Sequence, residues 1–275
     1  MSNNLREEVM KRTVSLIGLL TVLVGFTLGI PITACQHSSQ SKCTDLGVEE
    51  EDQSSVSDSN ILTLVVLVDL PNNELETIER ATKQITQTIH EHLGDEDQFS
   101  LIGGVYTGQS NNVSRVACMD GIPRSFAHVP GKNNDTKMKR ERQQYLNEVE
   151  EQMKSTLSTA AAPHDEVNTG DFRNLINWAK NQLGNTPSSN SRVILWSNFL
   201  SNGSDCLNIS TPASASAALA EEIVQRCQNA ELIPSLGNTE FQIIGSGYAM
   251  NAALSSFSSQ LAAAFCPRIS TNCRV

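Results

Sequence analysis

Side chains with oxygen ligands occur in three polar loops, each next to an apolar stretch. They are Asp69 and Asn73, then Thr169 and Asp171, and finally Ser197 and Asn198. Carboxylate, carboxamide and hydroxyl oxygens are the hard ligands that divalent cations such as Mg²⁺ and Ca²⁺ prefer. If the fold brings these loops together, they would form a site for a cation or for a polar partner.

Strands and helices are predicted to alternate along the chain, and their order places the three loops. The predicted strands are Ile61–Val68, Phe99–Tyr106, Ser114–Met119, Arg192–Trp196 and Glu240–Gly245. The predicted helices are Glu74–Leu93, Thr136–Leu157, Phe172–Leu183, Ala213–Ala230 and Ala252–Phe265. This alternation predicts an α/β three-layer sandwich, with a mostly parallel central sheet and helices on both faces. Ligands of such sheets bind beyond the carboxyl ends of the strands, where the strand order reverses.

The order of elements and loops resembles the von Willebrand factor type A (vWA) domain over roughly Asn60–Phe265. In that family a metal-ion-dependent adhesion site uses an Asp-x-Ser-x-Ser loop, a Thr and a final Asp. The ion keeps one position open for a carboxylate of the partner. Asp69 and Thr169 match the leading Asp and the Thr, so the resemblance implies a related site here.

Three positions depart from the pattern of the family. Pro71 and Asn73 stand where the two Ser residues belong, and Asn198 stands in place of the final Asp. The resemblance therefore implies a degenerate site, with no cofactor or with weakly held Mg²⁺ or Mn²⁺. Asp171 could supply a compensating carboxylate or could cap the following helix, and Ser197 is a further candidate binding residue. Asp69 could also serve only to order the turn that follows it.

The first 34 residues have the pattern of a secretory signal. Met1–Arg12 is polar and ends in two basic residues, Thr13–Ile30 carries no charge, and small residues precede Cys35. The sequence from Ile32 to Cys35 resembles the bacterial lipobox, which implies that residues 1–34 are removed and Cys35 is acylated. Acyl chains would anchor the protein in a bilayer. An uncleaved transmembrane helix is the alternative.

The predicted lipoprotein consists of an anchor, a linker and one domain. Residues 35–59 are rich in Ser and acidic residues and suit a solvated linker, so the domain is expected over residues 60–275. The alternative is that Cys43 pins part of this linker to the domain. Gln36, rather than Asp, follows the acylated residue. By family analogy this favours the outer membrane of a bacterial cell envelope, where the host has one.

The charge balance limits the partners. The chain has 20 basic and 30 acidic residues, a formal net charge of −10, which excludes nucleic acid as a partner. Basic residues gather mainly within Lys132–Lys154, where Lys139, Arg140 and Arg142 precede several Glu residues. This segment predicts a solvated helix face, with a docking surface for an acidic partner as the alternative.

Six cysteines follow the expected acylation site: Cys43, Cys118, Cys206, Cys227, Cys266 and Cys273. An even number in an exported chain favours disulfides over free thiols. Cys266 and Cys273 form the most plausible local pair, and Cys206 and Cys227 flank a predicted helix and could also meet. The sequence does not determine the remaining pairing.

The residues favour a binding module over an enzyme. Phosphate-binding loops and nucleophile elbows are absent from the sequence. We therefore expect a non-enzymatic domain that binds a protein partner, unidentified by the sequence, near the loop of Asp69. The alternative is an exported hydrolase that uses the same crevice, because Val68–Asn73 also resembles the opening of isochorismatase-like hydrolases. That reading requires Cys118 as the nucleophile.

Overall fold

The computed structural model of the chain describes residues 43, 46–48, 61–71, 74–106, 113–127, 135–160, 171–185, 190–200, 206–207, 216–248 and 252–275. Within these ranges the strands are β1 (Leu62–Asp69), β2 (Gln98–Tyr106), β3 (Val113–Asp120), β4 (Arg124–Ser125), β5 (Asn190–Ser197), β6 (Glu240–Ile244) and β7 (Cys273–Arg274). The helices described are α1 (Leu75–Leu93), α2 (Asp135–Ala160), α3 (Phe172–Asn185), α4 (Ala217–Asn229) and α5 (Ala252–Ile269). All ten predicted elements are present, with ends that differ by a few residues.

The strands form one sheet in the order β3-β2-β1-β5-β6-β7, and β4 pairs with β2. Neighbouring strands from β2 to β7 along this order are parallel, whereas β3 and β4 run antiparallel to β2. The mostly parallel sheet is therefore confirmed. Strands β2 and β3 lie on one side of β1, whereas β5, β6 and β7 lie on the other side. The strand order consequently reverses between β1 and β5.

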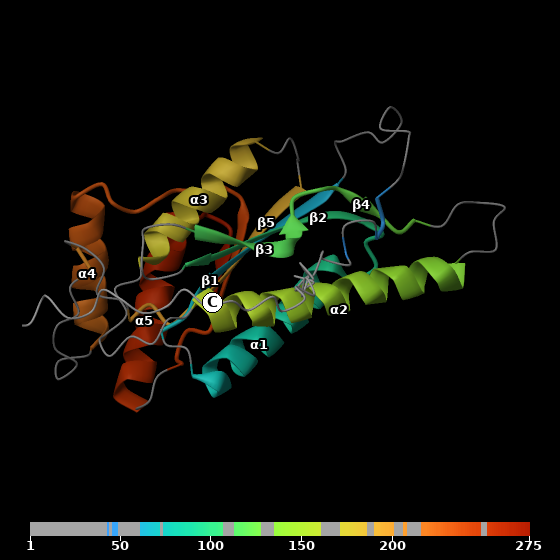
Figure 1. Cartoon of the computed structure of the whole chain (residues 1–275). Coiled ribbons are helices and arrows are strands. Elements are labelled where there is room, and N and C mark those ends of the chain that lie inside the picture. Colours follow the sequence, from blue (N-terminus) through green and yellow to red (C-terminus); the bar gives the residue numbers. More distant parts are fainter. Residues whose placement is uncertain are drawn as a thin grey trace, which may run out of the picture. The chain divides into compact units, whose positions relative to one another are not determined.

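Helices cover both faces of the sheet and complete a three-layer α/β sandwich. Helices α1 and α2 lie together on one face (Figure 1), where Ile85, Ile89 and Leu146 join the core beneath them. Helices α3 and α5 pack on the other face around Phe172 and Phe265, and α4 packs against α5. Each face of the sheet is buried, so β1 is apolar on both sides, as the continuous run of its sequence predicts.

Three disulfides link the six cysteines, and they join Cys43 to Cys118, Cys206 to Cys227, and Cys266 to Cys273. The pair that the sequence favours, Cys266–Cys273, is therefore confirmed, and the pair that it allows, Cys206–Cys227, is also present. Disulfides persist in oxidising compartments, so these bonds support an extracytoplasmic location for the domain. None of the helices in the described ranges has the length and apolar character needed to cross a membrane.

The domain expected to begin at residue 60 also includes part of the predicted linker. Cys43 is buried and bonded to Cys118, and the Ser125 amide donates to the carbonyl oxygen of Gly47 over 2.8 Å. The domain therefore includes Cys43, which lies well before its predicted start. The predicted signal segment 1–34 and the predicted acylation site, Cys35, lie outside the described residues.

Candidate functional site

The carboxyl ends of β1 and β5 meet at the point where the strand order reverses. Asp69 and Ser197 are direct partners in the register of these two strands. The hydroxyl of Ser197 donates to Oδ2 of Asp69 over 2.9 Å, and the two residues are only 1% and 0% exposed. Asp69 follows Val65 and Leu67 at the spacing of alternate strand residues, so it faces the layer of α3 and α5.

The loop after β5 is held by its own polar side chains. The Ser197 hydroxyl oxygen accepts from the Phe199 amide over 3.0 Å, and Asn198 Oδ1 accepts from the Leu200 amide over 3.1 Å. Such local turns are typical of Ser and Asn. Phe199 has a φ of 58°, and its ring lies 4.4 Å from that of Phe172 between centroids. Packing of this ring compensates for a backbone conformation that is costly for a non-glycine residue.

Helix α5 ties this loop to the loop after β6. The buried hydroxyl of Ser258 donates to the carbonyl oxygen of Asn198 and accepts from the Gly247 amide over 2.9 Å. Ser255, one turn earlier on the helix, donates to the carbonyl oxygen of Gly247. The ends of β5 and β6 are therefore fixed to each other through polar side chains of α5.

Asp171 lies at the start of α3 and is paired with Arg173. Asp171 accepts from the Arg173 amide over 3.0 Å and forms a buried ion pair with the Arg173 guanidinium, 2.6 Å at its closest. Arg173 Nη1 also lies 2.8 Å from the sulfur of Cys206. Of the two roles considered for Asp171, helix capping is therefore the one that the geometry displays.

Tyr106 is a member of this site that the sequence reasoning missed. It ends β2, next to β1, and burial raises its pKa above 10.0, with the charges of Asp69 and Asp171 adding to the effect. The phenol therefore stays protonated at physiological pH. A search of strand ends for hydroxyl groups as well as carboxylates would have found it, because Tyr106 ends a predicted strand.

The structure brings together four of the predicted site residues: Asp69, Asp171, Ser197 and Asn198. Asn73 and Thr169, the other two predicted ligands, lie outside the described residues. The described members are all buried, so they shape the loops around them more than they contact a partner directly.

Two of the described candidate ligands have partners that compete with a cation. The side-chain oxygen of Asn198 accepts a backbone hydrogen bond, and Asp171 is neutralised by Arg173. Asp69 supplies a carboxylate at the reversal point, and its Oδ2 accepts the hydrogen bond from Ser197. No group of three His, Cys, Asp or Glu side chains suited to a metal occurs in the part of the chain that the structure describes.

A second polar feature lies at the other end of the strands, where β5 and β6 begin. A depression of about 430 Å³ is lined by Leu183, Asn190, Ser191, Asn238, Thr239, Glu240 and Asn272. These residues belong to the amino ends of β5 and β6, to the turn before β7 and to the end of α3. The depression is therefore separate from the site of Asp69 and Ser197.

Comparisons with protein-family models, with curated proteins and with solved structures found no match for this chain. The fold and the geometry at the reversal point therefore carry the functional argument. Membership of the vWA family stays a proposal that rests on the order of elements and on the position of Asp69.

Proposed function

We propose that this chain is a lipid-anchored protein of the bacterial cell envelope, whose vWA-like domain binds another protein and catalyses no reaction. The observation that carries the proposal is the buried pair of Asp69 and Ser197 at the reversal point of the sheet. Hydrogen bonds from this pair and from Ser258 fix the loops that follow β5 and β6. The described parts of these loops, residues 198–200 and 245–248, are held in place, and groups that are fixed in advance lose little conformational freedom on binding a partner.

An exposed leucine next to this edge supports a protein partner. Leu75 is the first residue of α1, six positions after Asp69, and it is 63% exposed. A single exposed apolar residue is common on protein surfaces. Its position beside the loop of Asp69 puts an apolar side chain on the proposed contact face.

The enzyme alternative loses its nucleophile in this structure. Cys118 is bonded to Cys43, so its sulfur is not a thiolate. Cys118 also joins the core on the face of α1 and α2, whereas Asp69 faces α3 and α5. A hydrolase that uses both residues would need them on the same side of the sheet. We therefore favour binding over an isochorismatase-like reaction.

The binding proposal is tested with an affinity pull-down from detergent-solubilised envelope. Leu75→Glu places a charge at the proposed contact and should reduce the recovery of the captured protein about tenfold. Leu232→Glu is the matched control, because Leu232 is also exposed but lies between α4 and β6. Equal losses in both variants, or no loss in either, would contradict the proposed face.

Two further measurements test the anchor and the metal. Mass spectrometry of the mature protein should find acyl groups on an amino-terminal Cys35, and Cys35→Ser should release the protein from membranes.

Calorimetric titration with Mg²⁺ or Mn²⁺ should give no micromolar isotherm, and a chelator should leave the pull-down unchanged. A clean micromolar isotherm would show that the degenerate site still holds an ion.

A further inference from the structure

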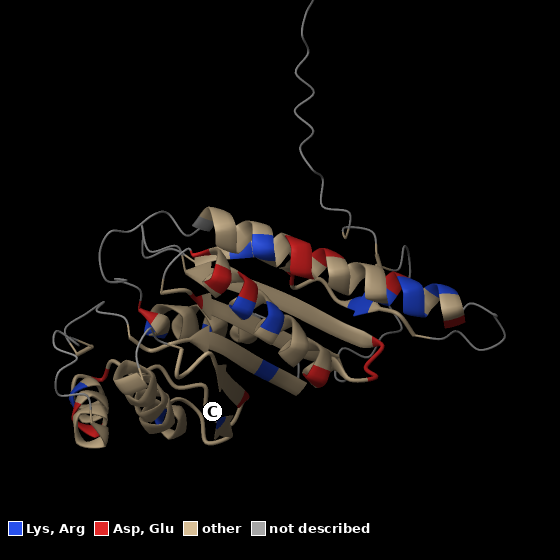
Figure 2. Ribbon diagram, turned by 90° about the horizontal axis from the view of Figure 1, so that it is seen from below, with Lys and Arg blue, Asp and Glu red and all other residues tan. Residues whose placement is uncertain are grey.

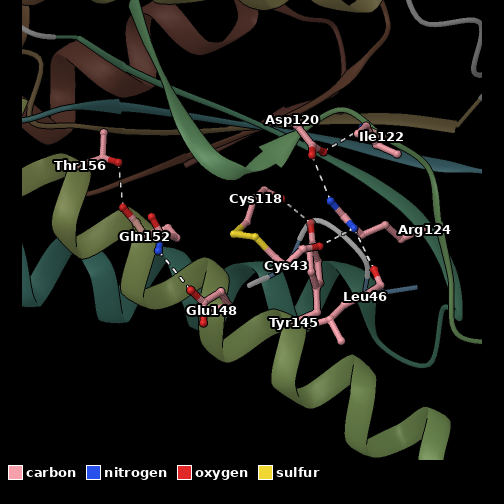
Figure 3. Close-up of a disulfide and its surroundings, with 10 residues drawn as sticks. All are labelled: Cys43, Leu46, Cys118, Asp120, Ile122, Arg124, Tyr145, Glu148, Gln152 and Thr156. Carbon is pink, nitrogen blue, oxygen red and sulfur yellow. Dashed lines mark hydrogen bonds and ion pairs between the residues drawn. A yellow bond between two sulfur atoms is a disulfide. The ribbon is translucent and has the colours of Figure 1, made fainter. Parts of the chain in front are cut away.

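The segment around Cys43 is built into the domain by a covalent bond and by a buried arginine. The disulfide to Cys118 fixes one end of the segment to β3. Arg124 Nη1 donates to the carbonyl oxygens of Cys43 and Leu46, each over 2.8 Å, and Nη2 donates to Asp120 over 3.0 Å (Figure 3). The guanidinium therefore clamps the segment at two carbonyl oxygens.

Aromatic side chains of the core pack against the same segment. A β-carbon at Gly47 would lie 2.5 Å from the ring of Phe126, and Gly47 has a φ of 71°, which other residues rarely adopt. Phe126 stacks with Phe99 at 5.7 Å between ring centroids, and Tyr145 donates its hydroxyl to the Cys118 carbonyl oxygen over 2.6 Å. The segment is thus in close contact with the core and is not a free linker.

This attachment shortens the tether that the sequence predicts. Seven residues, 36–42, separate Cys35 from Cys43, and they span at most about 25 Å when fully extended. A free linker of 24 residues, 36–59, could reach about 80 Å. An acyl group on Cys35 would therefore hold the corner of Cys43 close to the bilayer.

The corner of attachment lies toward the amino ends of the strands. Arg124 and Ser125 of β4 pair with Phe99 and Gln98 at the start of β2. Arg142 in the first half of α2 donates to the carbonyl oxygen of Gly94, just after α1 ends. This half of α2 extends past the sheet in both views (Figures 1 and 2). Asp69 lies at the carboxyl end of β1, about 25 Å away along this eight-residue strand.

We infer that a phospholipid headgroup surface lies against this corner, formed by residues 46–48, β4 and the first half of α2. The inference rests on the proposed lipid anchor at Cys35. It follows that the loops around Asp69 point away from the membrane, where a partner can reach them. The length of the tether, rather than the charge of the corner, sets the distance between the corner and the membrane.

The side chains of this corner suit a membrane contact that depends on the tether rather than on strong adhesion to lipid. Lys139 and Arg140 of α2 are exposed, but Asp95, Glu96 and Asp97 follow α1 nearby, and Figure 2 shows both signs at this end. Mixed charge gives no strong adhesion to anionic lipid. Val48 and Ile122, 38% and 42% exposed, add apolar side chains to the same corner.

The orientation is measured by energy transfer from the acylated mature protein to rhodamine-labelled lipid in phosphatidylethanolamine and phosphatidylglycerol vesicles. A fluorescent noncanonical amino acid replaces Lys139 in one sample and Glu76 in another. Both side chains are exposed. Glu76 lies in the first turn of α1, whereas Lys139 lies in α2 one turn before Arg142, which contacts Gly94 just past the other end of α1. The 19-residue α1 between these two places is about 28 Å long. Transfer from position 139 should be at least twice that from position 76.

A variant with a longer tether tests whether the short tether causes this difference in energy transfer. The variant Cys43→Ser, Cys118→Ser and Arg124→Lys removes both the disulfide and the clamp and should lose most of this contrast. The variant Cys266→Ser with Cys273→Ser removes another disulfide and should keep it. Equal transfer from both positions of the unaltered chain, with the protein bound to vesicles, would overturn the orientation alone. Absence of lipid on Cys35 would overturn both the orientation and the proposed anchor.

Discussion

The hydroxyl of Ser197 donates to Oδ2 of Asp69 over 2.9 Å, and this bond joins the carboxyl ends of β1 and β5. Ser197→Ala would leave that oxygen with one partner fewer and would remove the acceptor of the Phe199 amide. We expect the free energy of unfolding to fall by about 1–3 kcal/mol, measured by urea denaturation. Ser256→Ala, at an exposed position of α5, is the control and should change stability by less than about 0.5 kcal/mol. Equal stability of the two variants would mean that the bond is not formed.

The clamp of Arg124 predicts a large effect from a conservative change. Lysine keeps the charge but cannot reach two carbonyl oxygens and a carboxylate with a planar fork. Arg124→Lys should lower the free energy of unfolding by about 2–4 kcal/mol and should expose residues 43–48 to proteolysis. Arg115→Lys is the matched control, because Arg115 donates to Gln182 at an exposed position. If both variants resist protease equally, the clamp does not hold this segment.

His92 predicts a dependence of stability on pH. Burial lowers its pKa below the ordinary value of 6.5, and its ring lies between Gln242 and Arg192. The unfolded chain binds a proton at this residue as the pH falls through 6.5, whereas the folded chain resists it. Stability should therefore decrease from pH 7.5 to pH 5.5 through this residue.

The contribution of His92 is isolated by substitution. His92→Gln should reduce the difference between urea midpoints at pH 7.5 and pH 5.5, because no proton is then taken up at this position on unfolding. His90→Gln, at an exposed position of α1, should keep the difference of the unaltered chain. An unchanged difference in His92→Gln would assign the acid sensitivity to other groups.

Two glycines give opposite predictions for the same substitution. A β-carbon at Gly103 would lie 2.9 Å from Cβ of Met119 and 3.0 Å from Cβ of Val116, so Gly103→Ala should destabilise the fold by about 1–3 kcal/mol. Gly184 lies in α3 with nothing within 4 Å, and Gly184→Ala should stabilise it by about 0.5–1 kcal/mol. Thermal melting of both variants checks the signs, and a stabilised Gly103→Ala would contradict the close packing of β2 and β3.

Much of the fold could be predicted because its signals are local. The apolar run before Asp69 and the stripe of Ile78, Ile85 and Ile89 each identify an element without any partner. The strands β4 and β7 have two residues each, too few for any periodicity, and were missed. Their pairing is decided by contacts with distant residues.

The candidate site was predicted in its position but not in its chemistry. The rule that strand ends meet at a reversal point placed Asp69 beside Ser197, as the structure confirms. The roles of Asn198 and Asp171 depend on the Leu200 amide and on Arg173, which spacing alone does not reveal. An attachment of the linker through Cys43 was an alternative that the sequence allowed, but its partner Cys118 and the contact with Arg124 lie far away in sequence.

The three disulfides each join one cysteine to the next cysteine along the chain after Cys35. A polypeptide that is oxidised while it emerges from a translocation channel, amino terminus first, would present the correct partner at every step. Maturation of this protein would then need an oxidant but no reshuffling by an isomerase.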